Sequence, residues 1–166
     1  ATPRALYFND EVYVATVAGG FLEIAVADPK LGVVFYTVEE TEQARPRFVR
    51  QTDPCLPCHA QLRTRNVPGL RLDSVFVDPG GQPIHSGGVR PMNHTTPLES
   101  RWGGWYVQGT HGAMWHLGNQ THPADTRPEP IKSDAAQNRE RLDEFVDVSP
   151  VLEPTSDIAA LMVLPH

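Results

Sequence analysis

Prolines spread along the chain are the feature that most limits how it can fold. The 166 residues include 16 prolines and 13 glycines. Proline lacks a backbone N–H and its ring clashes with the preceding turn of a helix, so such a chain cannot build a bundle of long helices. We therefore expect short elements joined by much irregular backbone. No apolar run approaches the roughly 18 residues that a membrane-spanning helix needs.

Charge and length narrow the class of protein further. The chain carries 14 lysines and arginines against 20 aspartates and glutamates, a formal net charge of −6. Nucleic acids are bound by basic surfaces, so we expect no nucleic-acid partner. The length suits one globular domain that buries a core without disulfides.

Both cysteines of the chain lie in one short motif, Cys55-Leu56-Pro57-Cys58-His59. C-x-x-C-H is the pattern of a covalent attachment site for c-type haem. Thiols about one helical turn apart can each form a thioether with a haem vinyl group, and the following histidine can ligate the iron. The motif predicts one covalent haem c, held by Cys55 and Cys58 and ligated by His59.

Three other interpretations of the cysteine pair stay open. A structural disulfide explains the two thiols but not the histidine. A thioredoxin-type redox pair needs a βαβ context, which Pro54 and Pro57 do not favour. Half of a zinc site needs a second pair of ligands, which His111 and His116 could supply.

A second axial ligand is expected on the other face of the iron, usually His or Met. The candidates are His85, Met92, His94, His111, Met114, His116 and His122. We favour His111, which has glycines close on both sides, or His94, which lies in a loop that could hold it rigidly. His116 and an open position remain alternatives. Together, His94, His111 and His116 could instead hold a second metal such as copper.

Arginines surround the haem motif. Residues 45–71 contain six arginines and one aspartate, a net charge of +5 in an acidic protein. These arginines, Arg50 among them, could pair with haem propionates or dock an acidic redox partner. They could equally form a solvated face paired with the acidic residues near the C-terminus. Trp105 is expected to line the haem pocket, although tryptophan is more commonly a core residue.

The pattern of apolar residues predicts an α+β domain with a mainly antiparallel sheet, PAS-like in one version, and haem c on a short helix. Strands are expected over residues 5–17, 21–27, 33–38, 73–77 and 102–111, and a strand is expected to return at 84–86. A helix is expected over 133–145, capped by Ser133. This is not the all-α fold of small cytochromes c. Residues 1–120 form the expected haem-binding domain, and residues 121–166 form a Pro-rich acidic connector with a C-terminal segment that packs on it.

Two further motifs follow the haem motif, Arg-Trp-Gly-Gly-Trp-Tyr-Val at 101–107 and Gly-Thr-His-Gly at 109–112. With Cys-Leu-Pro-Cys-His they make the chain resemble, over nearly its whole length, a family of bacterial exported proteins described as cytochrome c domain proteins. The resemblance implies one haem c. It also implies a histidine as the sixth ligand, because His94, His111 and His116 match histidine positions of the family while Met92 and Met114 do not. No activity comes with the resemblance.

The expected function is one-electron transfer by a mono-haem c-type cytochrome domain, with a redox protein as partner. Two histidine ligands set a lower reduction potential than a His/Met pair. Covalent haem attachment in bacteria takes place outside the cytoplasm, so we expect a periplasmic or otherwise exported protein. The alternatives are a haem-based redox or gas sensor and a peroxidase-like haem oxidoreductase. The chain starts without an initiator methionine and stops inside an apolar run, so we expect a fragment of a longer chain.

Overall fold

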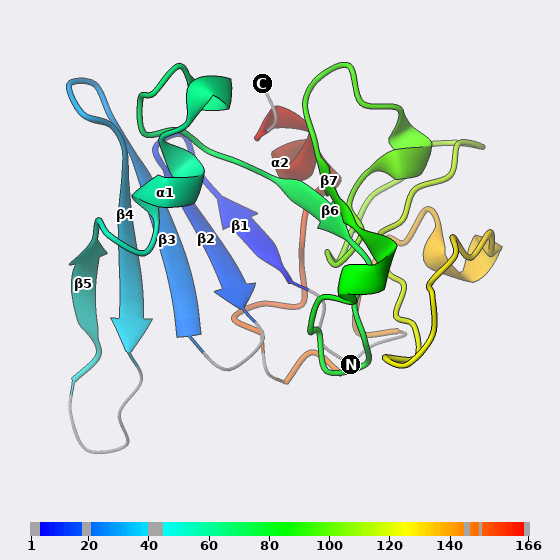
Figure 1. The fold of residues 1–166 in the computed structure, drawn as a ribbon. Coiled ribbons are helices and arrows are strands. Elements are labelled where there is room, and N and C mark those ends of the chain that lie inside the picture. The colour runs from blue at the N-terminus through cyan, green and yellow to red at the C-terminus, as the bar shows by residue number, and fades with distance from the viewer. Residues whose placement is uncertain (1–3, 18–20, 40–44, 145–146, 150, 165–166) are drawn as a thin grey trace.

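A five-stranded antiparallel sheet forms one layer of the molecule. The computed structural model describes residues 4–17, 21–39, 45–144, 147–149 and 151–164. Neighbouring strands follow chain order, so the sheet is a simple meander (Figure 1). The strands are β1 (Leu6–Phe8), β2 (Val12–Val17), β3 (Phe21–Asp28), β4 (Gly32–Glu39) and β5 (Arg47–Gln51).

Short side chains make the tight turns of this meander. The Asn9 side chain accepts hydrogen bonds from the backbone N–H groups of Glu11 (3.0 Å) and Val12 (2.7 Å) and so closes a turn between β1 and β2. Asp28 does the same for the two residues after Pro29. The single strand expected over 5–17 is therefore wrong, because the turn at Asn9 divides it into two paired strands.

The register of the sheet brings residues from three strands onto the face that carries the site. Tyr13 of β2 lies opposite Ala25 of β3, which lies opposite Phe35 of β4. Side chains alternate between the two faces along a strand, so these three point the same way. Phe35 is buried at 7% exposure, while Tyr13 and Ala25 are partly buried.

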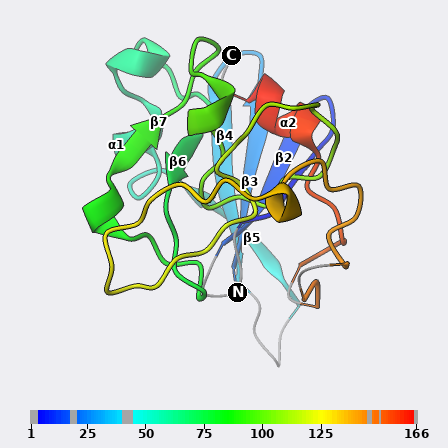
Figure 2. The same cartoon turned by 90° about the vertical axis from the view of Figure 1, so that its right-hand side faces the viewer.

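A second layer covers this face of the sheet. It contains the hairpin of β6 (Asp73–Val75) and β7 (Val89–Pro91), together with the short helix α1 (Leu56–His59). Figure 2 shows α1, β6 and β7 on the same side of the sheet. Four 3-10 turns complete the layer, at Leu62–Thr64, His85–Gly87, Leu98–Ser100 and Asp134–Ala136.

The main core lies where the helix α2 (Ile158–Val163) packs against β1. Leu161 and Trp102 are fully buried there, and Trp105 is nearly so. The buried hydroxyl of Ser156 accepts a hydrogen bond from the Leu6 N–H (3.0 Å) and donates to the Tyr106 carbonyl (2.8 Å). Through these contacts the C-terminal segment closes the core that begins at β1.

The tryptophan-glycine segment is not the strand expected over 102–111. It consists of turns, with isolated bridges that pair Trp105 with Arg4 and Gln108 with Asp157. A Cβ at Gly103 would lie 2.6 Å from the Val75 carbonyl oxygen, so glycine permits a close approach of two backbones there. Gly103 thus marks the place where this segment crosses close to the end of β6.

Two other expected elements are also absent. Residues 85–87 form a 3-10 turn, and the strand that pairs with β6 begins only at Val89. The helix expected over 133–145 is reduced to the 3-10 turn Asp134–Ala136, although Ser133 caps it by accepting from the Ala135 N–H. Phe145, the expected anchor of that helix, lies outside the described residues.

At the coarse level, the mainly antiparallel, sheet-rich α+β architecture agrees with the prediction from sequence. Within the parts of the chain that the structure describes, no helix is long and apolar enough to cross a membrane.

The core formed by α2 can be tested by comparing two of its residues. Leu161 is fully buried and Val163 is 52% exposed. Leu161→Ala leaves a cavity and is expected to lower the free energy of unfolding by about 3 kcal/mol. The control Val163→Ala is expected to change it by less than about 0.5 kcal/mol. Urea denaturation measures both, and equal effects would show that α2 does not pack as described.

Candidate functional site

The cysteine motif forms the short helix α1 directly after the edge strand β5. The carbonyl of Thr52 accepts hydrogen bonds from the N–H groups of Cys55 (3.2 Å) and Leu56 (2.9 Å), which starts the first turn. Cys55 occupies the N-cap position, and Pro57 is tolerated because first-turn N–H groups lack helical partners. This single turn brings the side chains of the motif to one side of the sheet.

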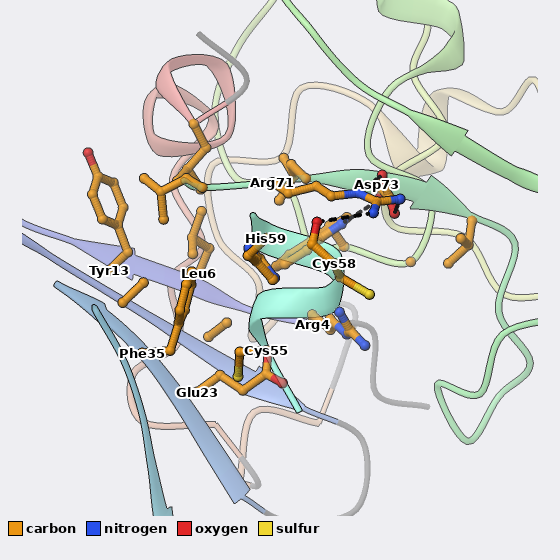
Figure 3. Close-up of a pocket in the computed structure, with 18 of the residues that line it drawn as sticks. Arg4, Leu6, Tyr13, Glu23, Phe35, Cys55, Cys58, His59, Arg71 and Asp73 are labelled. Carbon is orange, nitrogen blue, oxygen red and sulfur yellow. Dashed lines mark hydrogen bonds and ion pairs between the residues drawn. The ribbon is translucent and has the colours of Figure 1, made fainter. Parts of the chain in front are cut away.

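Cys55, Cys58 and His59 all line one cavity of about 450 Å³ between the sheet and the second layer (Figure 3). Leu6 of β1 and Phe35 of β4 contribute apolar walls from the sheet, while Trp105 contributes one from the second layer. A largely apolar cavity of this size, with a few polar groups converging on it, is typical of a site for an organic ligand or cofactor.

The imidazole of His59 is held in one orientation. Its Nδ1 lies 3.0 Å from the carbonyl oxygen of Gly69, so Nδ1 carries the proton and donates. Its ring packs on Phe35 with 4.5 Å between ring centroids. A histidine that ligates a metal through Nε2 usually donates Nδ1–H to a carbonyl in this way. His59 therefore keeps the lone pair of Nε2 available to an iron atom.

The loop over residues 61–69 holds the motif in place. The His59 carbonyl accepts hydrogen bonds from the Gly69 N–H (2.9 Å) and from the Thr64 hydroxyl (3.1 Å). The Pro68 carbonyl accepts from the Val33 N–H at the start of β4 (2.8 Å). The loop thus connects both sides of His59 to the sheet, which explains how a four-residue helix can have a fixed position.

The thiols of the motif are not joined to each other. Cys58 is exposed and Cys55 is partly buried. Burial, followed by the nearby charges of Glu23 and Cys58, raises the pKa of the Cys55 thiol. A thioredoxin-type nucleophile needs a lowered thiol pKa, so the surroundings of Cys55 do not favour that interpretation.

Arg71 and Trp105 connect the motif to β6. Arg71 forms an ion pair with Asp73 (2.7 Å), and one of its remaining N–H groups reaches the Cys58 carbonyl (3.5 Å). The indole N–H of Trp105 donates to the Asp73 carbonyl (3.0 Å). Trp105 lines the cavity, and this hydrogen bond fixes its ring beside β6.

Three sequence-predicted site residues lie away from this cavity. Arg50 lies opposite Tyr36 in the sheet, on the face that Phe35 does not share, and its side chain is exposed. His94 is exposed in a loop whose carbonyl groups accept hydrogen bonds from the buried Arg101. His111 also lies outside the cavity lining. The structure therefore does not bring Arg50, His94 or His111 next to His59.

The Gly-Thr-His-Gly segment has a structural role instead. The Asn138 side-chain oxygen accepts from the backbone N–H groups of His111 (2.7 Å) and Gly112 (3.1 Å), and the backbone N–H of Asn138 donates to His111 Nε2 (3.2 Å). The His111 ring packs on His116, with 4.7 Å between ring centroids. Both imidazoles are thereby committed to packing between this segment and the connector.

His116 is the most deeply buried histidine of the chain's described parts. Its ring packs against Trp102, and its Nδ1 accepts from the Gly118 N–H (3.0 Å). Burial, and secondarily His111, lowers the pKa of His116 to about 3. Among the described residues no three histidine, cysteine or acidic side chains are placed to hold a metal ion together, so neither the zinc site nor the copper site considered above is assembled.

The cavity also contains residues to which the sequence analysis gave no role, and one candidate ligand, His85, that it did not favour. Gly69 and Phe35 position His59, and His85 shares the cavity lining with it. Gly69 lies ten residues after His59 and directly follows a proline in the sequence. Nothing distinguished Phe35 from other apolar strand residues.

Acid stability tests the environment of His116. A histidine in the unfolded chain titrates near 6.5, whereas in the fold the pKa of His116 is about 3, so the unfolded state binds the extra proton between these values. Stability is therefore lost as pH falls through that window. In His116→Gln, the free energy of unfolding is expected to fall less steeply with decreasing pH, by up to about 1.4 kcal/mol per pH unit.

Urea midpoints between pH 7 and the acid limit of folding measure this slope. His94→Gln, at an exposed loop position outside the cavity, is the matched control for a histidine substitution. An identical slope in His116→Gln and the unmodified protein would contradict the buried neutral imidazole.

Comparisons with protein-family models, with curated proteins and with solved structures found no match to this chain.

Proposed function

We propose that this chain is a mono-haem c-type cytochrome domain that transfers single electrons. One haem c is bonded to Cys55 and Cys58 and ligated by His59. When bound, the haem supplies an iron centre that cycles between Fe(III) and Fe(II). The observation that carries the proposal is the pair of unlinked thiols at a cavity into which His59 is oriented by its hydrogen bond to Gly69.

The residues present fit this group better than the alternatives. The raised pKa of Cys55 argues against a dithiol oxidoreductase, and the absence of a third metal-binding side chain among the described residues argues against zinc. A disulfide would give no role to the oriented imidazole of His59. A cavity walled by Leu6, Phe35 and Trp105 suits a flat apolar macrocycle.

The proposal has consequences for architecture and location. The haem-carrying segment is α1, and a sheet with its cofactor on one face is a PAS-like arrangement. Covalent attachment places the protein in the periplasm or in another exported location. The partner is another redox protein, because the proposed reaction moves one electron and converts no substrate.

The placement of the histidines supports one candidate for a second ligand of the iron. Of the histidines considered, His85 lines the same cavity as His59, while His94 and His111 do not. His85 lies on the exposed turn that follows Ile84. We propose His85 as the sixth ligand in place of His94 or His111.

A second candidate function follows from the same placement. His85 is exposed and belongs to a turn of three residues, so it can leave the iron without disturbing a packed core. A displaceable sixth ligand is what a haem-based gas sensor needs. This observation favours the sensor over the peroxidase-like enzyme as the alternative.

Covalent haem attachment is tested by producing the protein with a bacterial haem c maturation system. The purified protein is expected to gain the mass of one haem and to give a c-type pyridine haemochrome spectrum. Cys55→Ser with Cys58→Ser is expected to abolish both signals, because no thioether can form. His94→Gln, in a loop outside the cavity, is the control and should retain them. A mature, folded protein without porphyrin, produced beside a correctly loaded reference cytochrome, would refute the proposed function.

Carbon monoxide tests the sixth position. The reduced protein is expected to bind carbon monoxide weakly, and His85→Ala is expected to bind it readily because the ligand has been removed. His111→Gln is the control and should behave like the unmodified protein. Ready binding by the unmodified protein would instead favour the sensor, and unchanged weak binding by His85→Ala would exclude His85 as the ligand. Absorption spectra of the reduced forms measure each outcome.

A further inference from the structure

We propose that the exposed surface around Cys58 is a docking site for an acidic face of the redox partner. This docking surface consists of Pro57, Cys58, Leu62, Arg63 and Arg65, from α1 and the turn that follows it (Figure 1). The inference rests on the proposed function, because Cys58 marks where the edge of a covalent haem would meet solvent. It adds the chemical character of the partner, which the electron-transfer function alone does not specify.

The docking surface is rigid and lies next to the cavity. Cys58 is exposed, and it also borders a second groove of about 710 Å³ that Arg63 and Arg71 line. The turn carrying Arg63 is fixed by reciprocal hydrogen bonds between Gln61 and Thr64. Because Thr64 also bonds to the His59 carbonyl, the docking surface and the iron ligand belong to one connected unit.

The cations of this surface are not neutralised by the protein itself. Arg63 and Arg65 are exposed, and neither guanidinium group forms an ion pair or hydrogen bond with the described residues. The ion pairs that the described residues do form are Arg71–Asp73, Arg141–Asp143 and Arg141–Glu144. The acidic connector therefore does not pair with these arginines in the described structure. Both arginines belong to residues 45–71, whose formal net charge is +5, although Arg71 within this range is paired with Asp73 outside it.

Apolar side chains accompany the charges. Leu62 is 85% exposed and Val67 is 51% exposed, both beside the two arginines in the turn. Apolar centres with a charged rim are common at protein–protein interfaces, where complementary charge speeds and orients the encounter. The combination fits a protein partner whose docking face carries carboxylates.

An anionic membrane fits this surface less well. Electrostatic attachment to lipid headgroups normally uses a cluster of four to eight lysines or arginines on one segment. The docking surface has two arginines whose side chains form no ion pair with the described residues, and it also presents the exposed Leu62. We therefore infer an acidic protein as its occupant.

The sign of the charge at the electron-exchange site can be measured without knowing the partner. The reduced, haem-loaded protein is mixed with anionic hexacyanoferrate(III) or with cationic tris(phenanthroline)cobalt(III), and oxidation rates are followed over a range of salt concentrations. Net charge alone predicts repulsion of the anion, which salt relieves. The docking surface predicts attraction, so the rate with hexacyanoferrate(III) is expected to fall as salt rises, and the rate with the cobalt complex to rise.

Matched variants locate the effect. Arg63→Gln with Arg65→Gln is expected to lower the low-salt rate with hexacyanoferrate(III) several-fold and to leave the high-salt rate unchanged. The control, Arg127→Gln with Lys132→Gln, removes the same net charge from exposed positions in the connector and is expected to have little effect. Covalent haem content is measured for every variant.

The outcomes separate this inference from the proposed function. A protein without haem contradicts the proposed function and this inference together. A haem-loaded protein whose rate with hexacyanoferrate(III) rises with salt, or whose two double variants behave alike, overturns the docking surface alone. Flotation of the unmodified protein, and not of Arg63→Gln with Arg65→Gln, on phosphatidylglycerol vesicles would assign the surface to a membrane and also overturn the inference.

Discussion

The reciprocal hydrogen bonding between His59 and Gly69 determines the geometry of the proposed site. The Gly69 carbonyl accepts from the imidazole of His59, and the Gly69 N–H donates to the His59 carbonyl. One residue thus fixes both the side chain and the backbone of the histidine. Without this contact a helix of four residues would have no fixed orientation, since an isolated turn is unstable in water.

Other distinctive parts of the sequence hold the second layer together. Arg101 is buried and holds the loop at 93–96 through three carbonyl groups, and Gly103 allows a backbone crossing against β6. Trp105 then reaches the cavity wall. The tryptophan-glycine motif at 101–107 therefore has a packing role and shapes one side of the cavity. The neighbouring Gly-Thr-His-Gly segment at 109–112 is held by Asn138.

The fold was partly predictable from sequence. Alternating β-branched and aromatic residues predicted most of the sheet, and its antiparallel order followed from short turns such as that at Asp28. The segment at 102–111 was predicted incorrectly. Its apolar residues resemble those of a strand, but Gly103 allows its backbone to cross close to β6. Trp102 even adopts a left-handed backbone with φ of 66°, which no propensity for tryptophan indicates.

The sequence alone determined the chemistry that the site can offer. Cys55, Cys58 and His59 lie within five consecutive residues. The peptide chain itself therefore keeps the two thiols and the imidazole close together, whatever the rest of the fold. Tertiary structure decided which other residues face them. It brought Phe35, Trp105 and His85 to the cavity and left Arg50, His94 and His111 elsewhere. These placements depend on strand register and on contacts between residues far apart in the chain, which local sequence does not encode.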